Sequence, residues 1–274
     1  MANALFLSPY YSDAAAVTFA GGAASGFPAT NMQVTNPAKV GRTGAGFPQS
    51  IQCDFGSGVA ATACAVIGSN LSSGATWKIG ASNTNMATAL ASPAFTAVTA
   101  GTSIWIGTKP TTPGLPFTTA FATWANSTAY RYWAITISDS GPSYMDVGRF
   151  MLGTVWQPAL NIDQNISIGF ESADLAGRSA TNQFVSERRG SVARRLGLTF
   201  STASESEARS FAGVVRQVGA GGDFMFAIDP ADTSNFSEWG GQFYFASMPT
   251  MSGVPLFIGG RPAWGVQAAI SEVL

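Results

Sequence analysis

The pattern of apolar and polar positions predicts a pair of strands within the first half of the chain. Residues 51–56, IQCDFG, alternate between apolar and polar side chains, which is typical of a half-buried strand. After a Gly-Ser-Gly turn, residues 63–67 form an almost continuous apolar run, short enough for a buried central strand. We therefore expect two strands and a turn over residues 50–71, with the other strands of this half laid around them.

Other short apolar runs in the first half predict further strands. The most strand-like run is YRYWAITI at residues 130–137, and YMDVGRFML at residues 144–152 is expected to be its partner. Residues 2–20 predict one or two edge strands, and residues 77–82 predict another strand after a Ser-Ser-Gly turn.

Two longer segments carry little strand pattern. Residues 83–128 are rich in Thr, Ala and Pro and predict a long excursion with weak strands. Residues 21–50 are dense in Gly, Pro, Asn and Thr, and we expect an ordered loop because apolar anchors punctuate it. These anchors are Phe27, Met32, Val34, Val40 and Phe47.

The second half combines strands with one helix. The helix is predicted to begin at Ser204, which forms a capping box with Glu207, and an apolar stripe follows before glycines end it. Residues 183–188 and 192–200 are predicted to pair as a hairpin. Further strands are predicted at residues 166–170, 223–229, 242–246 and 265–273.

These patterns predict a mainly β chain with two domains. Residues 1–155 are expected to form an antiparallel β-sandwich, and residues 158–274 a smaller α+β domain in which one main helix packs on a sheet. The boundary is placed near residues 153–158, where the pattern of the sequence changes. A chain of 274 residues is long enough for one large domain or for two of ordinary size.

Charged side chains are scarce in this composition. They make up 11% of the residues, against about 25% in a typical soluble domain. A sparsely charged surface favours a protein in an assembly, where neighbouring subunits cover much of that surface. The alternative is a secreted or simply low-charge β protein. The net charge of −1 gives no general attraction to nucleic acid.

The residue types of common catalytic and metal sites are missing or poorly placed. The chain has no histidine, and two cysteines cannot build a zinc site. Serine catalysis lacks both a histidine base and a G-x-S-x-G elbow. Two carboxylate pairs lie in turn contexts that favour structural roles over glycosidase chemistry, namely Asp139 with Asp146 and Asp229 with Asp232. We expect no catalytic residue, no metal ligand and no cofactor, and predict that the protein is not an enzyme.

Cys53 and Cys64 are open to two interpretations. A hairpin centred between Gly58 and Val59 would place them opposite each other, where a disulfide is geometrically feasible. Otherwise they are two small buried core residues. The first residues, MANALFLSPYYSD, lack the regions of a signal peptide, and no apolar run approaches the ~20 residues of a membrane span. We therefore expect a cytoplasmic chain with reduced thiols.

Short motifs follow one another in a fixed order through most of residues 28–274. In the first half they are PATNM (28–32), IQCDFG (51–56), AVIGSNLSSGATWKIGASN (65–83), YRYWAITISD (130–139) and YMDVGRFMLG (144–153). This series resembles the discoidin-like, galactose-binding-like jelly roll, and more narrowly the minor tail proteins of long-tailed, siphovirus-like phages that carry it. The second half continues the resemblance with GRS (177–179), RR (188–189), RLGLTF (195–200), EARSF (207–211) and DP (229–230). Ser69 departs from the pattern, because that family usually has a histidine before Asn-Leu.

The resemblance implies a structural, distal-tail-like component of a phage tail tip or baseplate. Such proteins form a ring around the tail axis, between the tail tube and the hub. Six copies are favoured, and three are the alternative. The implied partners are copies of the chain and other tail proteins, including the tube, the hub and tail fibres. The implied location is the virion, after assembly in the cytoplasm of the host bacterium.

Four arginines within eight residues form the candidate oligomer interface, namely Arg188, Arg189, Arg194 and Arg195. Arginine is enriched at protein interfaces and forms bidentate pairs with carboxylates. The other interpretation is a solvated hairpin tip that pairs with Glu187. Nucleic acid is a poor partner, since residues 158–274 carry more acidic than basic side chains.

The alternative function is a carbohydrate-binding module that contacts a glycan on the host-cell surface. Tryptophan rings offer flat apolar faces on which a sugar can stack. Trp77 and Trp133 lie in predicted strands, which favours core packing, whereas Trp105 and Trp124 lie in loops and are the candidate glycan contacts. A calcium ion held by loop carbonyls would fit the fold and cannot be read from the sequence.

Overall fold

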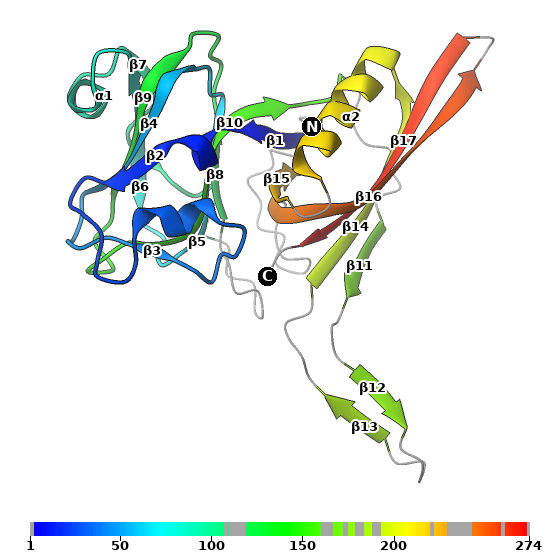
Figure 1. Ribbon diagram of the computed structural model, residues 1–274, viewed down its shortest axis with the longest axis horizontal. Helices are drawn as coiled ribbons and strands as arrows, with labels where there is room; N and C mark the ends of the chain where they lie inside the picture. Colours follow the sequence, from blue (N-terminus) through cyan, green and yellow to red (C-terminus); the bar gives the residue numbers. More distant parts are fainter. Residues whose placement is uncertain are drawn as a thin grey trace.

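The computed structural model describes residues 3–106, 109, 119–159, 167–171, 175–178, 184–187, 193–219, 222–228, 243–258 and 261–272. All strand pairs among these residues are antiparallel. The prediction of a mainly β chain, with a sandwich followed by strands and one main helix, is confirmed (Figure 1).

A five-stranded sheet forms one layer of the sandwich. In spatial order its strands are β2 (Ala16–Phe19), β4 (Gln49–Val59), β9 (Tyr130–Ser138), β6 (Thr76–Ser82) and β7 (Phe95–Ser103). The aromatic and β-branched sequence of β9 suits its central place between β4 and β6. The strands predicted at residues 77–82 and 130–137 are therefore confirmed.

A ten-stranded sheet forms the second layer and continues beyond the sandwich. Along its main path the strands are β11 (Ser167–Glu171), β14 (Ala193–Ala203), β17 (Arg261–Glu272), β16 (Phe243–Ile258), β15 (Phe224–Ala227), β1 (Leu5–Tyr10), β10 (Asp146–Trp156), β5 (Ala63–Ser69) and β8 (Thr119–Thr123). The short strand β3 (Gly41–Arg42) pairs with β10 beside this path.

The apolar run 63–67 is explained by burial on both faces of β5. Cys64 and Val66 face the sandwich core, which lies between the five-stranded sheet and strands β10, β5 and β8. Ala65 and Ile67 face the opposite side, where they pack with residues of β1, β10 and β15. A strand covered on both faces loses the period-2 pattern, so the prediction of a buried central strand is confirmed.

The helix α2 (Glu205–Val218) packs on the part of the large sheet that lies beyond the sandwich. Its capping box of Ser204 and Glu207 is present as predicted, and Gly219 follows it with a positive φ of 62°. The buried residues of α2 pack on Phe6 of β1 and on strands β14, β15 and β17. The first strand of the chain therefore supplies part of the core beneath the helix.

The position of β1 bears on the predicted domain boundary. β1 pairs with β10 on one side and with β15 on the other, so one continuous sheet runs from the sandwich into the second half of the chain (Figure 1). The boundary near residue 155 stays a prediction. The expectation that residues 2–20 supply only edge strands is wrong for β1, which is interior, and correct for β2.

Three predicted strand pairs are wrong. β4 and β5 lie in different sheets, and so do β9 and β10. β13 (Phe184–Glu187) pairs with β12 (Leu175–Arg178), while β14 pairs with β11 and β17. In each case the strands take other partners. The sequence does not reveal this, because a connection between the layers of a sandwich and a hairpin turn share the same local signals.

The two segments with little strand pattern nevertheless contain regular elements. Residues 83–128 include α1 (Met86–Ala91), which Asn85 caps, and the edge strands β7 and β8. Residues 21–50 include the 3-10 helix η2 (Ala29–Gln33), and a second 3-10 helix, η1 (Ser12–Ala14), precedes β2. Of the predicted anchors, Met32 is buried, but Phe27 and Val34 are exposed.

Candidate functional site

The structure describes two of the four arginines of the predicted interface. Arg194 and Arg195 are neighbours on β14, where Arg194 is buried and Arg195 is exposed. Successive residues of a strand point to opposite faces of the sheet, so these two side chains do not form one patch. Arg188 and Arg189 lie outside the described residues, and the interface role of the four arginines stays a prediction.

The described carboxylate pair has structural roles. Asp139 accepts hydrogen bonds from the backbone N–H and the hydroxyl of Ser72 and from the N–H of Gly141. Asp146 forms a bidentate ion pair with Arg42. Asp229 and Asp232 lie outside the described residues. Among the residues that the structure describes, no group of three or more Cys, Asp and Glu side chains could hold a metal ion.

The two cysteines are buried, free core residues on facing sheets. Cys53 on β4 is opposite Trp133 in register, whereas Cys64 on β5 faces the same core from the other layer. Burial raises the pKa of both thiols, which keeps them protonated. The predicted hairpin that would place them on one sheet is wrong, and the interpretation as small core residues is confirmed.

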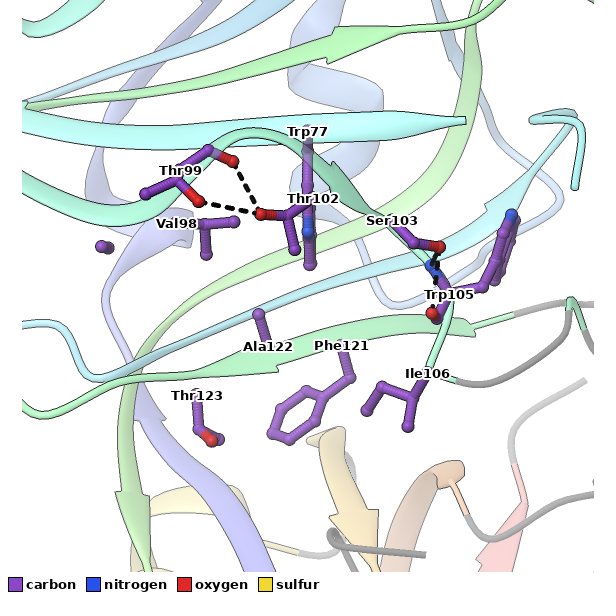
Figure 2. A pocket seen from close by; sticks show the side chains of 11 residues that line it. Trp77, Val98, Thr99, Thr102, Ser103, Trp105, Ile106, Phe121, Ala122 and Thr123 are labelled. Carbon is purple, nitrogen blue, oxygen red and sulfur yellow. Dashed lines mark hydrogen bonds between the residues drawn. The ribbon is translucent and has the colours of Figure 1, made fainter. Parts of the chain in front are cut away.

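A pocket of about 510 Å³ opens between the edge strands β7 and β8 (Figure 2). Trp77, Phe121 and the candidate glycan contact Trp105 line it. Trp77 and Trp105 each expose only 3% of their surface, and Trp105 donates its indole N–H to the carbonyl of Ser72 at 2.7 Å. The ring faces that a sugar would need are therefore covered.

Trp124, the second candidate glycan contact, lies at the other end of the sandwich. Its indole N–H donates to the carbonyl of Ala61, before β5, whereas Trp105 contacts Ser72, after β5. The Trp124 ring is half-buried and lies 5.8 Å from the ring of Trp133, which belongs to the core. Core packing of Trp77 and Trp133 is confirmed, and the structure does not bring Trp105 and Trp124 together.

A different set of residues forms an exposed surface at the end of the sandwich where β5 and β9 finish. We call it the Arg42 surface. Its members come from three separate loops and strand ends of the chain and are Phe27, Arg42, Asn70, Tyr144 and Asp146.

The backbone brings these segments together. β3 pairs with β10 so that Arg42 lies opposite Asp146, and the Arg42 N–H donates to the carbonyl of Phe27 at 3.1 Å. The Asn70 side chain connects the third segment: it donates to the carbonyl of Tyr144 at 2.9 Å and accepts from the N–H of Asp146 at 2.8 Å. Each member is therefore held by strand pairing, by a backbone hydrogen bond or by a side-chain hydrogen bond.

The Arg42 guanidinium contacts two aromatic rings. Its central carbon is 4.6 Å from the ring centroid of Phe27 and 4.3 Å from that of Tyr144, distances typical of cation–π contacts. Its Nε and Nη2 donate to the two oxygens of Asp146 at 2.7 and 2.8 Å, and this hydrogen bonding raises the pKa of Arg42. The guanidinium is thus fixed in one orientation and stays charged.

The Arg42 surface holds the two most exposed aromatic side chains of the described residues. Only three large apolar side chains among them are exposed, namely Phe27 at 37%, Val34 at 36% and Tyr144 at 38%. Two of these three flank Arg42. Exposed rings next to fixed polar groups mark a binding surface more often than scattered apolar residues do.

Sequence reasoning missed this surface. Phe27 was expected to be an anchor of the loop, and Arg42 lies in a two-residue strand that has no recognisable pattern. The available signal was weak: Arg42 and Lys39 are the only charged residues of the segment 21–50. Nothing in the local sequence connects that segment with Tyr144.

The opposite end of the sandwich carries a similar but less apolar arrangement. Arg131 donates through Nε and Nη2 to Asp54 at 2.7 and 2.9 Å, and its guanidinium lies 4.8 Å from the ring centroid of Tyr132. It has one aromatic neighbour where Arg42 has two. This pair provides a matched control for experiments on Arg42.

Comparisons with known proteins find similar folds but no sequence relative. No protein family matches the chain, and a search of curated proteins finds no match either. Among solved structures, chitosan-binding module 1 of a chitosanase/glucanase from Paenibacillus sp. IK-5 is 16% identical, with 52% of this chain and 97% of the module covered and a TM-score of 0.38.

Two more solved structures are similar at the same level. The family 32 carbohydrate-binding module of Clostridium perfringens NanJ, in complex with galactose, is 12% identical over 56% of this chain and 99% of that module, with a TM-score of 0.39. The lectin domain of lectinolysin, complexed with Lewis B antigen, is 11% identical over 54% of this chain and 98% of that domain, with a TM-score of 0.38.

The described part of this chain contains no helix that is long and apolar enough to cross a membrane.

Proposed function

We propose that the chain is a carbohydrate-binding module and that its glycan binds at the Arg42 surface. The observation that carries this proposal is the Arg42 guanidinium, which Asp146 holds in contact with the exposed rings of Phe27 and Tyr144. A sugar presents an apolar C–H face and a ring of hydroxyl groups. Exposed aromatic rings match the first, and fixed guanidinium and amide groups match the second.

The surface is also preorganised. Arg42 and Asn70 already have their orientation fixed by hydrogen bonds to the protein, so little side-chain entropy is lost when a ligand binds. The pocket between β7 and β8 is a weaker candidate, because the tryptophan rings that line it are buried.

A glycan array followed by isothermal titration tests the proposal. We expect at least one glycan to bind, and we expect Tyr144→Ala to weaken binding by about tenfold or more, since one stacking ring is lost. Tyr132→Ala, at the opposite end of the sandwich, should leave binding unchanged. Absence of binding across the array, or equal losses in both variants, would contradict the proposed site.

A structural role in a phage tail tip is the second candidate function. The order of the sequence motifs supports it, and so does the hairpin of β12 and β13, which stands apart from the body of the molecule (Figure 1). An isolated two-stranded hairpin is marginally stable in water, which favours a partner that covers it. In this role the chain would form a ring of six or three copies in the virion, between tail tube and hub, without enzymatic activity.

The two candidate functions are compatible, because the sandwich could bind a host-surface glycan while the second half contacts tail proteins. A mass measurement on the purified chain and a cryo-EM reconstruction of the intact particle test the second candidate. A monomer in solution that is also missing from the tail tip of the particle would contradict it.

A further inference from the structure

Arg149 shows how an arginine of this protein holds two carboxylates at once. Its Nε and Nη2 donate to Asp223 at 2.7 and 3.1 Å, while its Nη1 and Nη2 donate to Asp13 at 2.5 and 2.7 Å. The ring of Tyr10 lies over the same guanidinium, 5.1 Å from its central carbon. Both edges of the planar fork are therefore occupied by carboxylates beside an aromatic ring.

Arg42 has the same arrangement with one edge open. Its Nε and Nη2 hold the carboxylate of Asp146, as those of Arg149 hold Asp223, and the ring of Tyr144 covers the guanidinium. Two of the five guanidinium N–H groups are used on Asp146, so three remain. Among the described residues Nη1 has no partner, and the side chain is 30% exposed.

The other polar groups of the surface supply one further unused donor, while their oxygens are already engaged. Both oxygens of Asp146 accept from Arg42, and the amide oxygen of Asn70 accepts from the backbone. The Asn70 amide nitrogen has two N–H groups and uses one on the carbonyl of Tyr144. A ligand that brings hydrogen-bond acceptors, and above all a planar pair of oxygens, would satisfy the unused N–H groups of Arg42 and Asn70.

We infer that the glycan bound at the Arg42 surface is acidic and that the Nη1–Nη2 edge of Arg42 binds a sugar carboxylate. This inference rests on the proposed glycan-binding function and names the class of its ligand. A carboxylate matches the fork in a bidentate manner. The exposed rings of Phe27 and Tyr144 then lie beside the pyranose to which that carboxylate is attached.

Asp146 does not exclude a second carboxylate. The Arg149 cluster already accommodates two aspartates on one guanidinium, and there Asp223 is almost completely buried, with 1% exposure. The Arg42 surface is more open to water, so repulsion between the two carboxylates is better screened.

The test compares one oligosaccharide in two forms: with its hexuronic acid residues intact, and after reduction of the carboxyl groups to neutral hexose. We expect the wild-type protein to bind the acidic form at least about tenfold more tightly, the gain of a bidentate charged pair. Arg42→Lys keeps the charge but loses the fork, so the preference should fall to about threefold or less. Arg131→Lys, which changes the same chemistry at the other end, should retain the full preference.

Each outcome is informative. Equal affinity for the two forms, or a preference that survives Arg42→Lys, overturns the inference and leaves glycan binding intact. Absence of binding to either form and to the neutral glycans of an array contradicts the proposed function itself. Thermal unfolding of both lysine variants checks that they fold, and Tyr144→Ala, which keeps the guanidinium, gives an independent loss of affinity for both forms.

Discussion

Arg149 of β10 and Asp223, directly before β15, form an ion pair in which the two side chains are 0% and 1% exposed. Tyr10 donates its hydroxyl to the same carboxylate at 2.6 Å, and burial together with this bond raises the pKa of Tyr10. The Arg149 pKa is pulled down by burial but raised overall by its hydrogen bonds to Asp13 and Asp223. The cluster joins the sandwich to the second half of the chain.

Removal of the Arg149 charge should therefore be costly. In Arg149→Met, Asp223 is left buried without its cation, and we expect the free energy of unfolding to fall by about 3–5 kcal/mol. Arg209 forms an exposed i,i+4 pair with Glu205 on α2, and Arg209→Met should change stability by no more than about 0.5 kcal/mol. Chemical denaturation of both variants measures the difference, and similar effects would contradict a structural role for the buried cluster.

Two glycines should respond to alanine in opposite directions. A Cβ atom on Gly148 would lie 2.2 Å from the carbonyl oxygen of Pro37, where the loop of residues 21–48 crosses β10. We expect Gly148→Ala to destabilise the protein by about 1–3 kcal/mol through overpacking. Gly213 on α2 has open space at that position, so Gly213→Ala should stabilise it by about 0.5–1 kcal/mol. Thermal unfolding checks both signs, and a neutral Gly148→Ala would show that the loop is not held against β10.

The Asp139 carboxylate should contribute a pH-dependent part of the stability. Partial burial alone would raise the pKa of Asp139, but hydrogen bonds from Ser72 and Gly141 outweigh it and lower the pKa. A lowered folded-state pKa stabilises the protein above the unfolded value, about 3.9, and this stabilisation is lost as the pH falls through the folded value. Asp139→Asn should therefore cost about 1–2 kcal/mol at pH 7 and less at pH 3, which lies below the unfolded pKa, so that part of the stabilisation is lost. A difference that is the same at both pH values would be contrary to this account.

The sequence predicts individual elements better than their partners. The helix at residues 205–218 is recognisable because Ser204 and Glu207 form a local cap, and β9 is recognisable from its aromatic and β-branched residues. The pairing of β9 with β4 and β6 depends on how the chain crosses between layers. No local signal distinguishes that crossing from a hairpin, which is why β10 was assigned to the wrong partner.

The candidate site was beyond prediction for the same reason. Phe27 and Tyr144 are far apart in the sequence and come together at Arg42 because Arg42 pairs with Asp146 at the start of β10. The tryptophans chosen from the sequence are instead core residues or half-buried neighbours of the core. Exposure depends on the completed sandwich, so it cannot be read from the order of residues.

The most direct test of the proposed function is a crystal structure of the protein soaked with an oligosaccharide that binds in solution. We expect the sugar ring to lie on Phe27 or Tyr144, with one of its oxygens within hydrogen-bonding distance of Arg42 Nη1. A sugar seated instead between β7 and β8, or beside Arg131 and Asp54, with the Arg42 surface empty, would contradict the account.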